Sequence, residues 1–237
     1  MTISKELFFE ACGKMSVPVD DAIFNKFDTY ARLLIEWNEK VNLTAITAPD
    51  EILIKHFIDS VYLLKYVDIK ENGTLCDVGT GAGFPGAVVS ILRPDVKVTL
   101  MDSIGKKLQF VDCVVKTLGL NAEVVNMRAE DAGRKPEYRE KFDVVTARAV
   151  SQLNKLSEYC VPLVKVGGVF APLKAVLSKE EAQTGFGAAK NLGAQLVKKE
   201  IYSLPDESER EIVIFEKVSP TSPKYPRNSA QIAKKPL

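Results

Sequence analysis

The stretch TLCDVGTGAGFPG, from Thr74 to Gly86, decides the fold of this chain. It opens with a short apolar run that ends around Asp77 and continues directly into a glycine-rich loop. Gly79, Gly81 and Gly83 have no side chains that could keep a ligand away from the backbone amides of the loop. A strand that leads through such a loop into a helix is typical of the first unit of a nucleotide-binding α/β sheet.

Short apolar runs alternate with amphipathic stretches after this loop, which predicts βαβ units and a mainly parallel sheet. Two strand-like runs near the end are joined by LPDESER, which is too short for a crossover helix, so we expect them to pair antiparallel. The expected strands are 74–78, 96–101, 122–127, 142–147, 168–173, 196–202 and 211–218, and the expected helices are 84–92, 104–118, 151–164 and one from Ser178 towards Asn191.

The residues before the loop have a helical pattern. Ile23, Phe27, Tyr30, Leu34 and Trp37 recur at steps of three and four, which places them on one apolar stripe. The end of the chain is rich in proline and lysine and contains no acidic residue, so we expect it to lack regular structure by itself. These patterns divide the chain into an N-terminal helical extension (1–70), an α/β domain (71–218) and a basic Pro-rich tail (219–237).

The composition excludes several classes of protein. Of the 237 residues, 46% are hydrophobic and 27% charged, which is typical of a globular chain and not of a disordered one. The net charge of +1 excludes a generally basic surface, so a nucleic-acid partner would need a local basic patch. The four cysteines form no CxxC pair and there is one histidine, so we expect buried reduced thiols and no metal site.

No stretch approaches the roughly 18 apolar residues of a membrane span. Glu6 and Glu10 stand where a secretory signal would have its apolar run, so we expect no such signal. We therefore expect a cytoplasmic protein with no membrane partner, and a monomer.

Polar residues follow three successive strands. Asp102 ends the second strand, nineteen residues after Gly83, and Ala129 and Glu130 follow the third strand. The carboxyl ends of parallel strands meet at one edge of the sheet, so we expect these residues to form a cleft for an adenosine-containing ligand. Asp102 would bind the ribose, Ala129 and Glu130 would lie beside the adenine, and Asp77 would lie near the polar end of the ligand.

The acidic residues favour one adenosine ligand over another. A pyrophosphate is disfavoured by Asp77 directly before the loop, whereas a methionine ammonium or sulfonium suits a negatively charged cleft, so the pattern favours S-adenosylmethionine over a dinucleotide. Each acid also has a purely structural alternative: Asp77 could cap the amides of the loop, and Asp102 could cap the helix that begins near Ile104. Their joint placement favours the ligand.

Further motifs accompany the loop: VNLTAI at 41–46, KHFIDS at 55–60, MDSIGKKLQFV, MRAED, VTARAV, and KYPR before the terminal KKPL. With DVGTGAGFPG they resemble the bacterial 16S rRNA guanine-N7 methyltransferases, the glucose-inhibited division protein B family, over essentially the whole chain. The resemblance implies a class I S-adenosylmethionine-dependent methyltransferase fold, which is Rossmann-like, with an N-terminal helical extension. It also implies S-adenosylmethionine as cofactor and a guanosine in the decoding loop of 16S rRNA, or of the small ribosomal subunit, as target.

The resemblance implies that Gly79, Phe84, Ala129, Glu130 and Arg148 line the cofactor site. Transfer to guanine N7 needs no general base, because N7 has a free lone pair and no proton to lose. We therefore expect the protein to supply alignment.

Arg148 is the candidate catalytic residue. It could contact guanine O6 from one side, since a bidentate grip on O6 and N7 would block the reacting lone pair, or it could only shape the cofactor site. An ion pair with Asp77 or Glu130 is the structural alternative. We expect Arg148→Ala to keep the fold and to abolish transfer.

The presumed RNA contacts are less regular. Ala175 stands where the family often has glycine, and Asn228 stands where it often has a basic residue. A solvated surface and a tail without fixed structure are the alternative for this region. The residues expected to bind RNA phosphates or to stack on bases are Lys174, Lys224, Tyr225 and Arg227.

Three polar residues of the N-terminal part are expected to have structural roles. His56 is interpreted as a helix-surface or packing histidine, with RNA contact as the alternative. Asn42 and Thr44 are interpreted as residues that organise a turn between helices, with substrate contact as the alternative. Two rival functions stay open at this point: an NAD(P)-dependent oxidoreductase on a similar sheet, and a non-catalytic ribosome-assembly module that retains the cleft.

Overall fold

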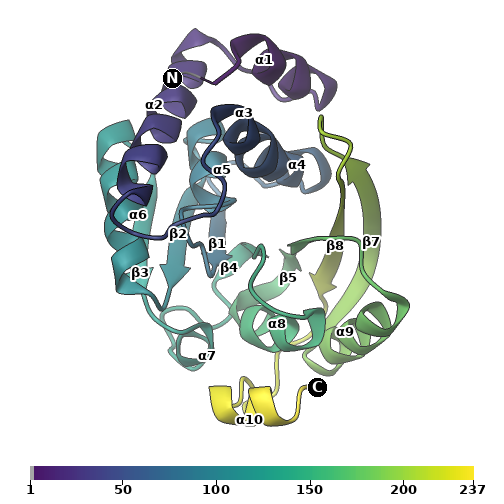
Figure 1. Cartoon of the computed structure of the whole chain (residues 1–237). Helices are drawn as coiled ribbons and strands as arrows, with labels where there is room; N and C mark the ends of the chain where they lie inside the picture. The colour runs from purple at the N-terminus through teal and green to yellow at the C-terminus, as the bar shows by residue number, and fades with distance from the viewer. Residues whose placement is uncertain (1–2) are drawn as a thin grey trace.

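One mixed sheet runs through the centre of the molecule in the computed structural model, which describes residues 3–237 (Figure 1). Its strands are β1 (Thr74–Val78), β2 (Lys97–Asp102), β3 (Ala122–Asn126), β4 (Phe142–Thr146), β5 (Val164–Phe170), β6 (Leu173–Lys174), β7 (Ala194–Ser203) and β8 (Glu209–Lys217). The order across the sheet is β3-β2-β1-β4-β5-β8-β6, and β7 pairs with β8. The first five strands in this order are parallel and β8 is antiparallel to its neighbours, as the sequence predicts.

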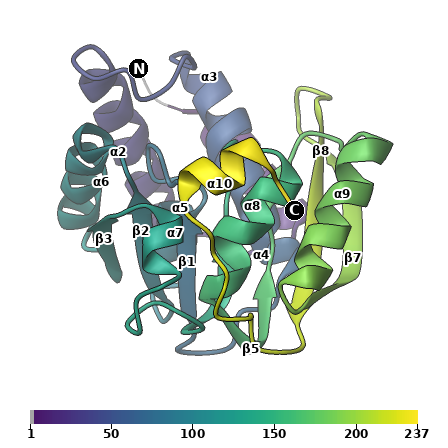
Figure 2. The ribbon, with the colours of Figure 1, turned by 90° about the horizontal axis from the view of Figure 1, so that it is seen from below.

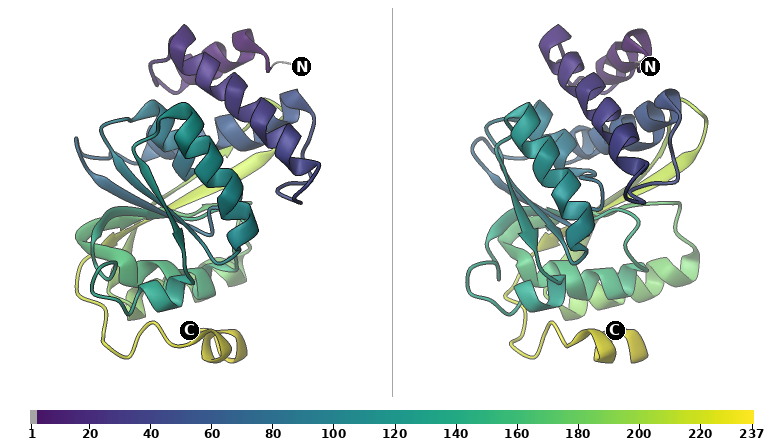
Figure 3. Two further views of the ribbon diagram at one scale, coloured as in Figure 1. Left: turned by 90° about the vertical axis from the view of Figure 1, so that its left-hand side faces the viewer. Right: turned by 60° about the vertical axis from the view of Figure 1, so that its left-hand side comes forward.

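Helices cover both faces of the sheet (Figures 2 and 3). Each layer buries its own apolar cluster against the strands. On one face lie α1 (Lys5–Lys14), α2 (Asp21–Asn38), α3 (Pro49–Ile52), the π-helix η1 (Leu53–Ile58), α4 (Asp59–Tyr66), α5 (Gly86–Leu92) and α6 (Gly105–Leu118). On the other lie α7 (Ala129–Ala132), α8 (Leu153–Cys160), the 3₁₀ helix η2 (Val161–Leu163), α9 (Lys179–Asn191) and α10 (Ser229–Lys234).

The N-terminal helices share the apolar core of the sheet. The Asp20 side chain accepts the Ile23 N–H at 2.8 Å and starts α2, and the expected stripe then buries Phe27, Tyr30 and Leu34 completely. Burial of each such side chain stabilises the fold by about 1.5–3 kcal/mol. Helix α2 thereby comes close enough to the glycine-rich loop to contact it.

Two expected elements differ in the structure. The expected strand 168–173 is divided into β5 and the short β6, with Ala171 and Pro172 between them. The expected helix 151–164 is shorter, because its last turn tightens into η2 around Pro162 and β5 begins at Val164. The expected caps and boundaries of the other central elements agree with the structure to within a few residues, and Ser178 caps α9 through the Glu181 N–H.

The tail is ordered, which corrects the expectation that it lacks regular structure. Asn228 forms a capping box with Gln231 and starts α10, which lies against α8 (Figure 2). The Arg139 guanidinium donates hydrogen bonds to the carbonyl oxygens of Thr221 and Tyr225, at 2.7 and 2.8 Å. Proline and lysine content alone does not reveal these long-range partners.

All four cysteines are free thiols: Cys12, Cys76 and Cys160 are buried, whereas Cys113 is only half-buried. Within residues 3–237, no helix has both the length and the apolar character needed to cross a membrane.

Candidate active site

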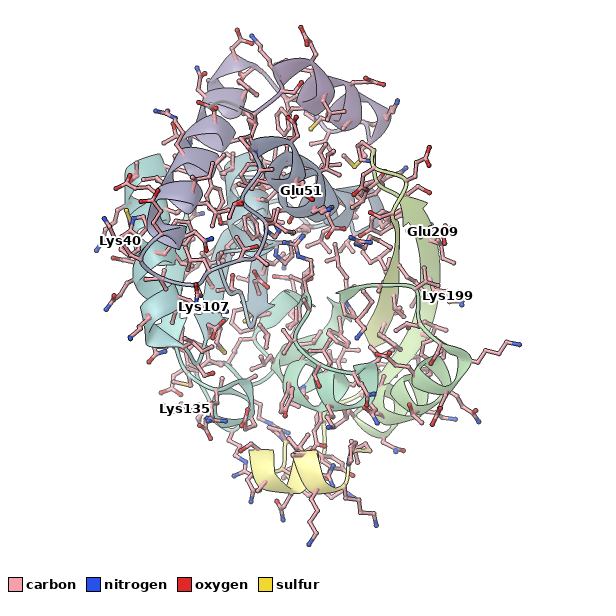
Figure 4. The ribbon with its side chains drawn as sticks, in the orientation of Figure 1. Lys40, Glu51, Lys107, Lys135, Lys199 and Glu209 are labelled. Carbon is pink, nitrogen blue, oxygen red and sulfur yellow. The ribbon has the colours of Figure 1, made fainter. Side chains whose placement is uncertain are left out.

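A cleft of about 1020 Å³ opens at the carboxyl-terminal edge of the parallel strands. Its walls come from the loops that follow β1, β2, β3 and β4, together with η1, β6 and the loop between α2 and α3. Lys107, near the start of α6, also lies on the cleft wall (Figure 4). The cleft therefore lies where the sequence places it, and it also receives residues from the N-terminal helices.

The glycine-rich loop is held close to β2. Gly79 has a φ of 68° and donates its N–H to Met101 O at 2.8 Å. A Cβ atom at Gly79 would lie 2.6 Å from Cγ2 of Val150, so only glycine fits between this loop and the loop after β4. The Gly81 N–H bonds to Oδ2 of Asp102 at 2.9 Å, which fixes the loop against the end of β2.

Asp102 lies on the cleft wall with its two oxygens each partly used. Oδ2 accepts from Gly81, and Oδ1 accepts the Ile104 N–H at 2.9 Å in the turn before α6, whereas no side chain caps the helix itself. Each carboxylate oxygen has a further lone pair, and vicinal ribose hydroxyls are donors that match them. Ala129 and Glu130 lie on the same cleft wall. These residues fit an adenosine group.

Asp77 does not lie on the cleft wall, which corrects its expected position near the polar end of the ligand. The Asp77 side chain is fully buried. Oδ2 accepts from the Thr80 hydroxyl at 2.6 Å and the Gly86 N–H at 2.8 Å. Burial, the largest influence, raises the pKa of this carboxyl to about 6. Asp77 therefore organises the loop from below, and Gly83, which faces Tyr30, is also absent from the cleft wall.

Phe84 belongs to an aromatic cluster at the cleft. Its ring stacks against Tyr30 with centroids 5.2 Å apart, and against His56 with centroids 4.7 Å apart and planes inclined by 11°. The Tyr30 hydroxyl donates to Ala82 O at 2.5 Å, which ties α2 to the loop. Phe84 thus stands on the cleft wall in a fixed position, with only 5% of its surface exposed.

His56 is a site residue that the sequence analysis missed. It lines the cleft, and burial, reinforced by Arg148, lowers its pKa to about 3. The ring is therefore neutral at physiological pH. The available signal was that the chain has one histidine and that it stands in KHFIDS, but a helical pattern gives no information on which face meets the loops of the sheet.

Arg148 lies in the cleft, and its ion-pair partner differs from the one expected. Its Nη1 donates to Oδ2 of Asp59 at 2.7 Å, and the Asp59 side chain is 3% exposed. The other oxygen of Asp59 accepts from the Tyr202 hydroxyl at 2.9 Å. The alternative of an ion pair with Asp77 or Glu130 is therefore wrong, although the arginine is fixed by an acid as that alternative supposed.

The π-helix supplies further acceptors for Arg148. The Asp59 N–H bonds to Ile54 O, five residues earlier, so the carbonyl of Lys55 does not receive its usual α-helical donor. Arg148 Nη1 donates to that carbonyl at 3.2 Å and to His56 O at 3.3 Å. Short π-helical segments of this kind are frequent at functional sites.

The structure separates Lys174 from the other three expected RNA contacts, which lie together around the Tyr225 ring. Lys174 lines the cleft, where it bonds to Ser151 O at 2.7 Å and to Glu181 at 2.8 Å. The other three do not line it, and the Lys224 ammonium lies 5.1 Å from the Tyr225 ring centroid. Of the two positions that depart from the family pattern, Ala175 lines the cleft and Asn228 caps α10.

Arg227 is a structural clamp, which corrects its expected role as a free phosphate ligand. Its Nε and Nη2 bond to the two oxygens of Glu158 at 2.8 and 2.6 Å, and its backbone N–H also donates to Oε1. The Glu158 side chain is 0% exposed. The pair holds the tail against α8, next to Tyr159 on the cleft wall.

Removing this clamp is expected to destabilise the protein. Arg227→Met leaves the Glu158 carboxylate buried without its partner, which should lower the free energy of unfolding by about 3–5 kcal/mol in urea titrations. The exposed Lys224 is the matched control, and Lys224→Met should change the free energy of unfolding by less than ~0.5 kcal/mol. Equal stability of the two variants would contradict the clamp.

Comparison with known proteins decides the family. The family model of the rRNA small subunit methyltransferase G proteins, GidB, matches residues 23–213. The chain belongs to this family. A Ribosomal RNA small subunit methyltransferase G from Lactobacillus delbrueckii subsp. bulgaricus is 45% identical over 239 residues, covering 99% of this chain and 100% of the relative. One from Desulfitobacterium hafniense is 46% identical over 226 residues, covering 94% and 93%.

Solved structures agree on the fold of this rRNA small subunit methyltransferase G family member. A SAM-dependent O-methyltransferase from Thermotoga maritima aligns with a TM-score of 0.53 at 16% identity, covering 80% of this chain and 72% of the other. The TYW2 protein of M. jannaschii, solved in complex with AdoMet, aligns with a TM-score of 0.50 at 16% identity, covering 63% and 71%. The predicted family, class I fold and S-adenosylmethionine-dependent rRNA methyltransferase activity are confirmed.

Proposed function

We propose that the cleft binds S-adenosylmethionine between the glycine-rich loop and Asp102, and that the protein transfers the methyl group to N7 of a guanosine in 16S rRNA. The Asp102 carboxylate carries this proposal. It is fixed by two backbone amides, lies on the cleft wall and keeps acceptor capacity for ribose hydroxyls. The bound cofactor would supply an electrophilic methyl group on a sulfonium.

In the proposed reaction the side chains of the protein position the reacting groups. His56 is neutral and hydrogen-bonded, so it is not arranged as a general base, and N7 has no proton to remove. Arg148 is held rigidly by Asp59 and by the π-helix carbonyls, which suits a residue that orients a neighbouring group. We infer that it orients the target base from one side, without occupying the N7 lone pair.

Cations outnumber carboxylates on the cleft wall, which corrects the expectation of a negatively charged cleft. A phosphate backbone that crosses the opening would meet several donors, so this balance supports an RNA substrate over a free nucleoside. Four of these cations are ion-paired with carboxylates, so the local basic patch that we propose for RNA is a modest excess of positive charge. The cations are Lys55, Lys107, Arg128, Arg148, Lys174 and Arg210, and the carboxylates are Asp59, Asp102, Glu130 and Glu181.

Ligand binding separates the proposal from the oxidoreductase. S-adenosylhomocysteine at about 100 times its dissociation constant should stabilise the folded chain by about 2.7 kcal/mol, which a thermal melt detects as a clear rise of the melting temperature. NAD and NADP should leave the melting temperature unchanged. Stabilisation by NAD and not by S-adenosylhomocysteine would contradict the proposed cofactor site.

Transfer of labelled methyl groups tests the reaction itself. The substrates are naked 16S rRNA and small ribosomal subunits from a strain that lacks the enzyme, and the labelled base is then mapped. We expect label at N7 of one guanosine, with a monomeric, cytoplasmic enzyme acting on the assembled particle, where shape adds affinity. Binding to subunits without transfer would favour the assembly module.

A further inference from the structure

The loop between α2 and α3 brings a hydroxyl group to the cleft. Thr44 lies on the cleft wall between the N-terminal helices and the sheet. Its backbone is fixed by Asn38, whose Oδ1 accepts the N–H groups of Leu43 and Thr44 at 2.9 and 3.0 Å. Asn38 Nδ2 donates in return to Thr44 O at 2.9 Å. The position of the hydroxyl is therefore set by the fold.

The contact with Arg148 favours one tautomer of the neighbouring histidine. Nδ1 of His56 lies 3.4 Å from Nη2 of Arg148. A guanidinium can only donate, so we infer that Nδ1 accepts from it and that the neutral ring carries its hydrogen on Nε2. Nε2 lies 2.9 Å from Oγ1 of Thr44 and therefore donates to it.

Both lone pairs of the Thr44 hydroxyl are thereby occupied. Oγ1 accepts from His56 Nε2 and also from the Ile46 N–H at 3.1 Å. A hydroxyl has two acceptor sites and one hydrogen. Within residues 3–237, no side chain or carbonyl accepts that hydrogen in this arrangement. The cleft wall therefore carries a hydroxyl that can donate and cannot accept.

We propose that Thr44 donates this hydrogen bond to O6 of the target guanine and so selects guanine over adenine. The inference rests on the proposed function and deepens it. O6 accepts, and a contact there leaves the lone pair of N7 free for the methyl group. Adenine presents an amino group at the same place, which would meet a donor whose lone pairs are already used.

The test uses target RNA with either guanosine or 2-aminopurine riboside, which lacks O6, at the methylated position. With guanosine, Thr44→Val should lower kcat/KM about 10- to 100-fold, whereas Thr44→Ser and the exposed control Thr117→Val should stay near the wild-type value. With 2-aminopurine, wild type and Thr44→Val should be equally slow.

Two kinetic results overturn this role of Thr44: a Thr44→Val variant as fast as wild type on guanosine RNA, or an equal loss on both RNAs. A wild-type enzyme that does not methylate guanosine N7 would instead refute the proposed function. The melting shift with S-adenosylhomocysteine should persist in Thr44→Val, which shows that the cofactor site remains intact.

The tautomer can be read directly, because the chain has one histidine. Nitrogen-15 NMR of the full chain near neutral pH should show a neutral ring protonated on Nε2. Protonation on Nδ1 would overturn the inference, since Nε2 would then take the hydrogen of the Thr44 hydroxyl.

Discussion

Arg148→Ala is expected to abolish methyl transfer, lowering kcat by at least ~100-fold, and also to destabilise the fold. The sequence alone predicts an unchanged fold, but the structure shows why stability must fall. The Asp59 carboxylate is nearly inaccessible to water and would lose its cation, and two helix carbonyls would lose a donor. Breaking such a pair costs about 3–5 kcal/mol of unfolding free energy, which urea titration measures.

A second substitution separates the two effects. Asp59→Asn removes the buried charge and leaves an amide that can still bond to the Tyr202 hydroxyl. The double variant Arg148→Ala/Asp59→Asn should therefore regain much of the lost stability while transfer remains absent. Recovery of activity together with stability would show that Arg148 is only structural. The ion pair between the exposed Arg32 and the half-buried Asp28 is the control, and Arg32→Ala should cost less than ~1 kcal/mol.

The sequence predicts the sheet well because strand periodicity and glycine-rich turns are local signals. It does not distinguish the roles of Asp77 and Asp102, because the depth of each residue in the sheet depends on the register of the strands. Asp77 pairs with Leu100, two residues before Asp102, so Asp77 lies deeper in the sheet and ends below the loop. Both acids follow an apolar run in the sequence, and only the pairing of the strands separates a loop-organising carboxylate from one on the cleft wall.

Long-range polar pairs are the second feature that the sequence does not predict. Arg148 and Asp59 are 89 residues apart, and Arg227 and Glu158 are 69 residues apart. Neither pair leaves a periodic signal, and a basic Pro-rich tail has the composition of a disordered segment. The tail is ordered because two buried or partly buried groups, Glu158 and Arg139, provide partners for it. Composition therefore predicts the behaviour of the tail in isolation and not in this fold.

Gly83→Ala is expected to have the largest effect of any single methyl group added to the loop. Gly83 has a φ of 98°, and a Cβ atom there would overlap the Tyr30 hydroxyl. Backbone strain and overpacking together should lower the free energy of unfolding by about 2–5 kcal/mol. Because Tyr30 also bonds to Ala82 O, displacement of its ring would move the loop, so binding of S-adenosylhomocysteine should weaken as well.

A control variant separates the effect of the steric contact with Tyr30 from the effect of backbone strain. Gly119 is the C-cap of α6 with a φ of 61°, and a Cβ atom added there would lie in open space, so Gly119→Ala should cost only about 1 kcal/mol. Tyr30→Phe removes the overlapping oxygen, and the double variant Tyr30→Phe/Gly83→Ala should be more stable than Gly83→Ala alone. Urea titrations that found Gly83→Ala no less stable than Gly119→Ala would show that α2 does not constrain the loop. The N-terminal helices would then be an attachment to the cofactor site and not part of its wall.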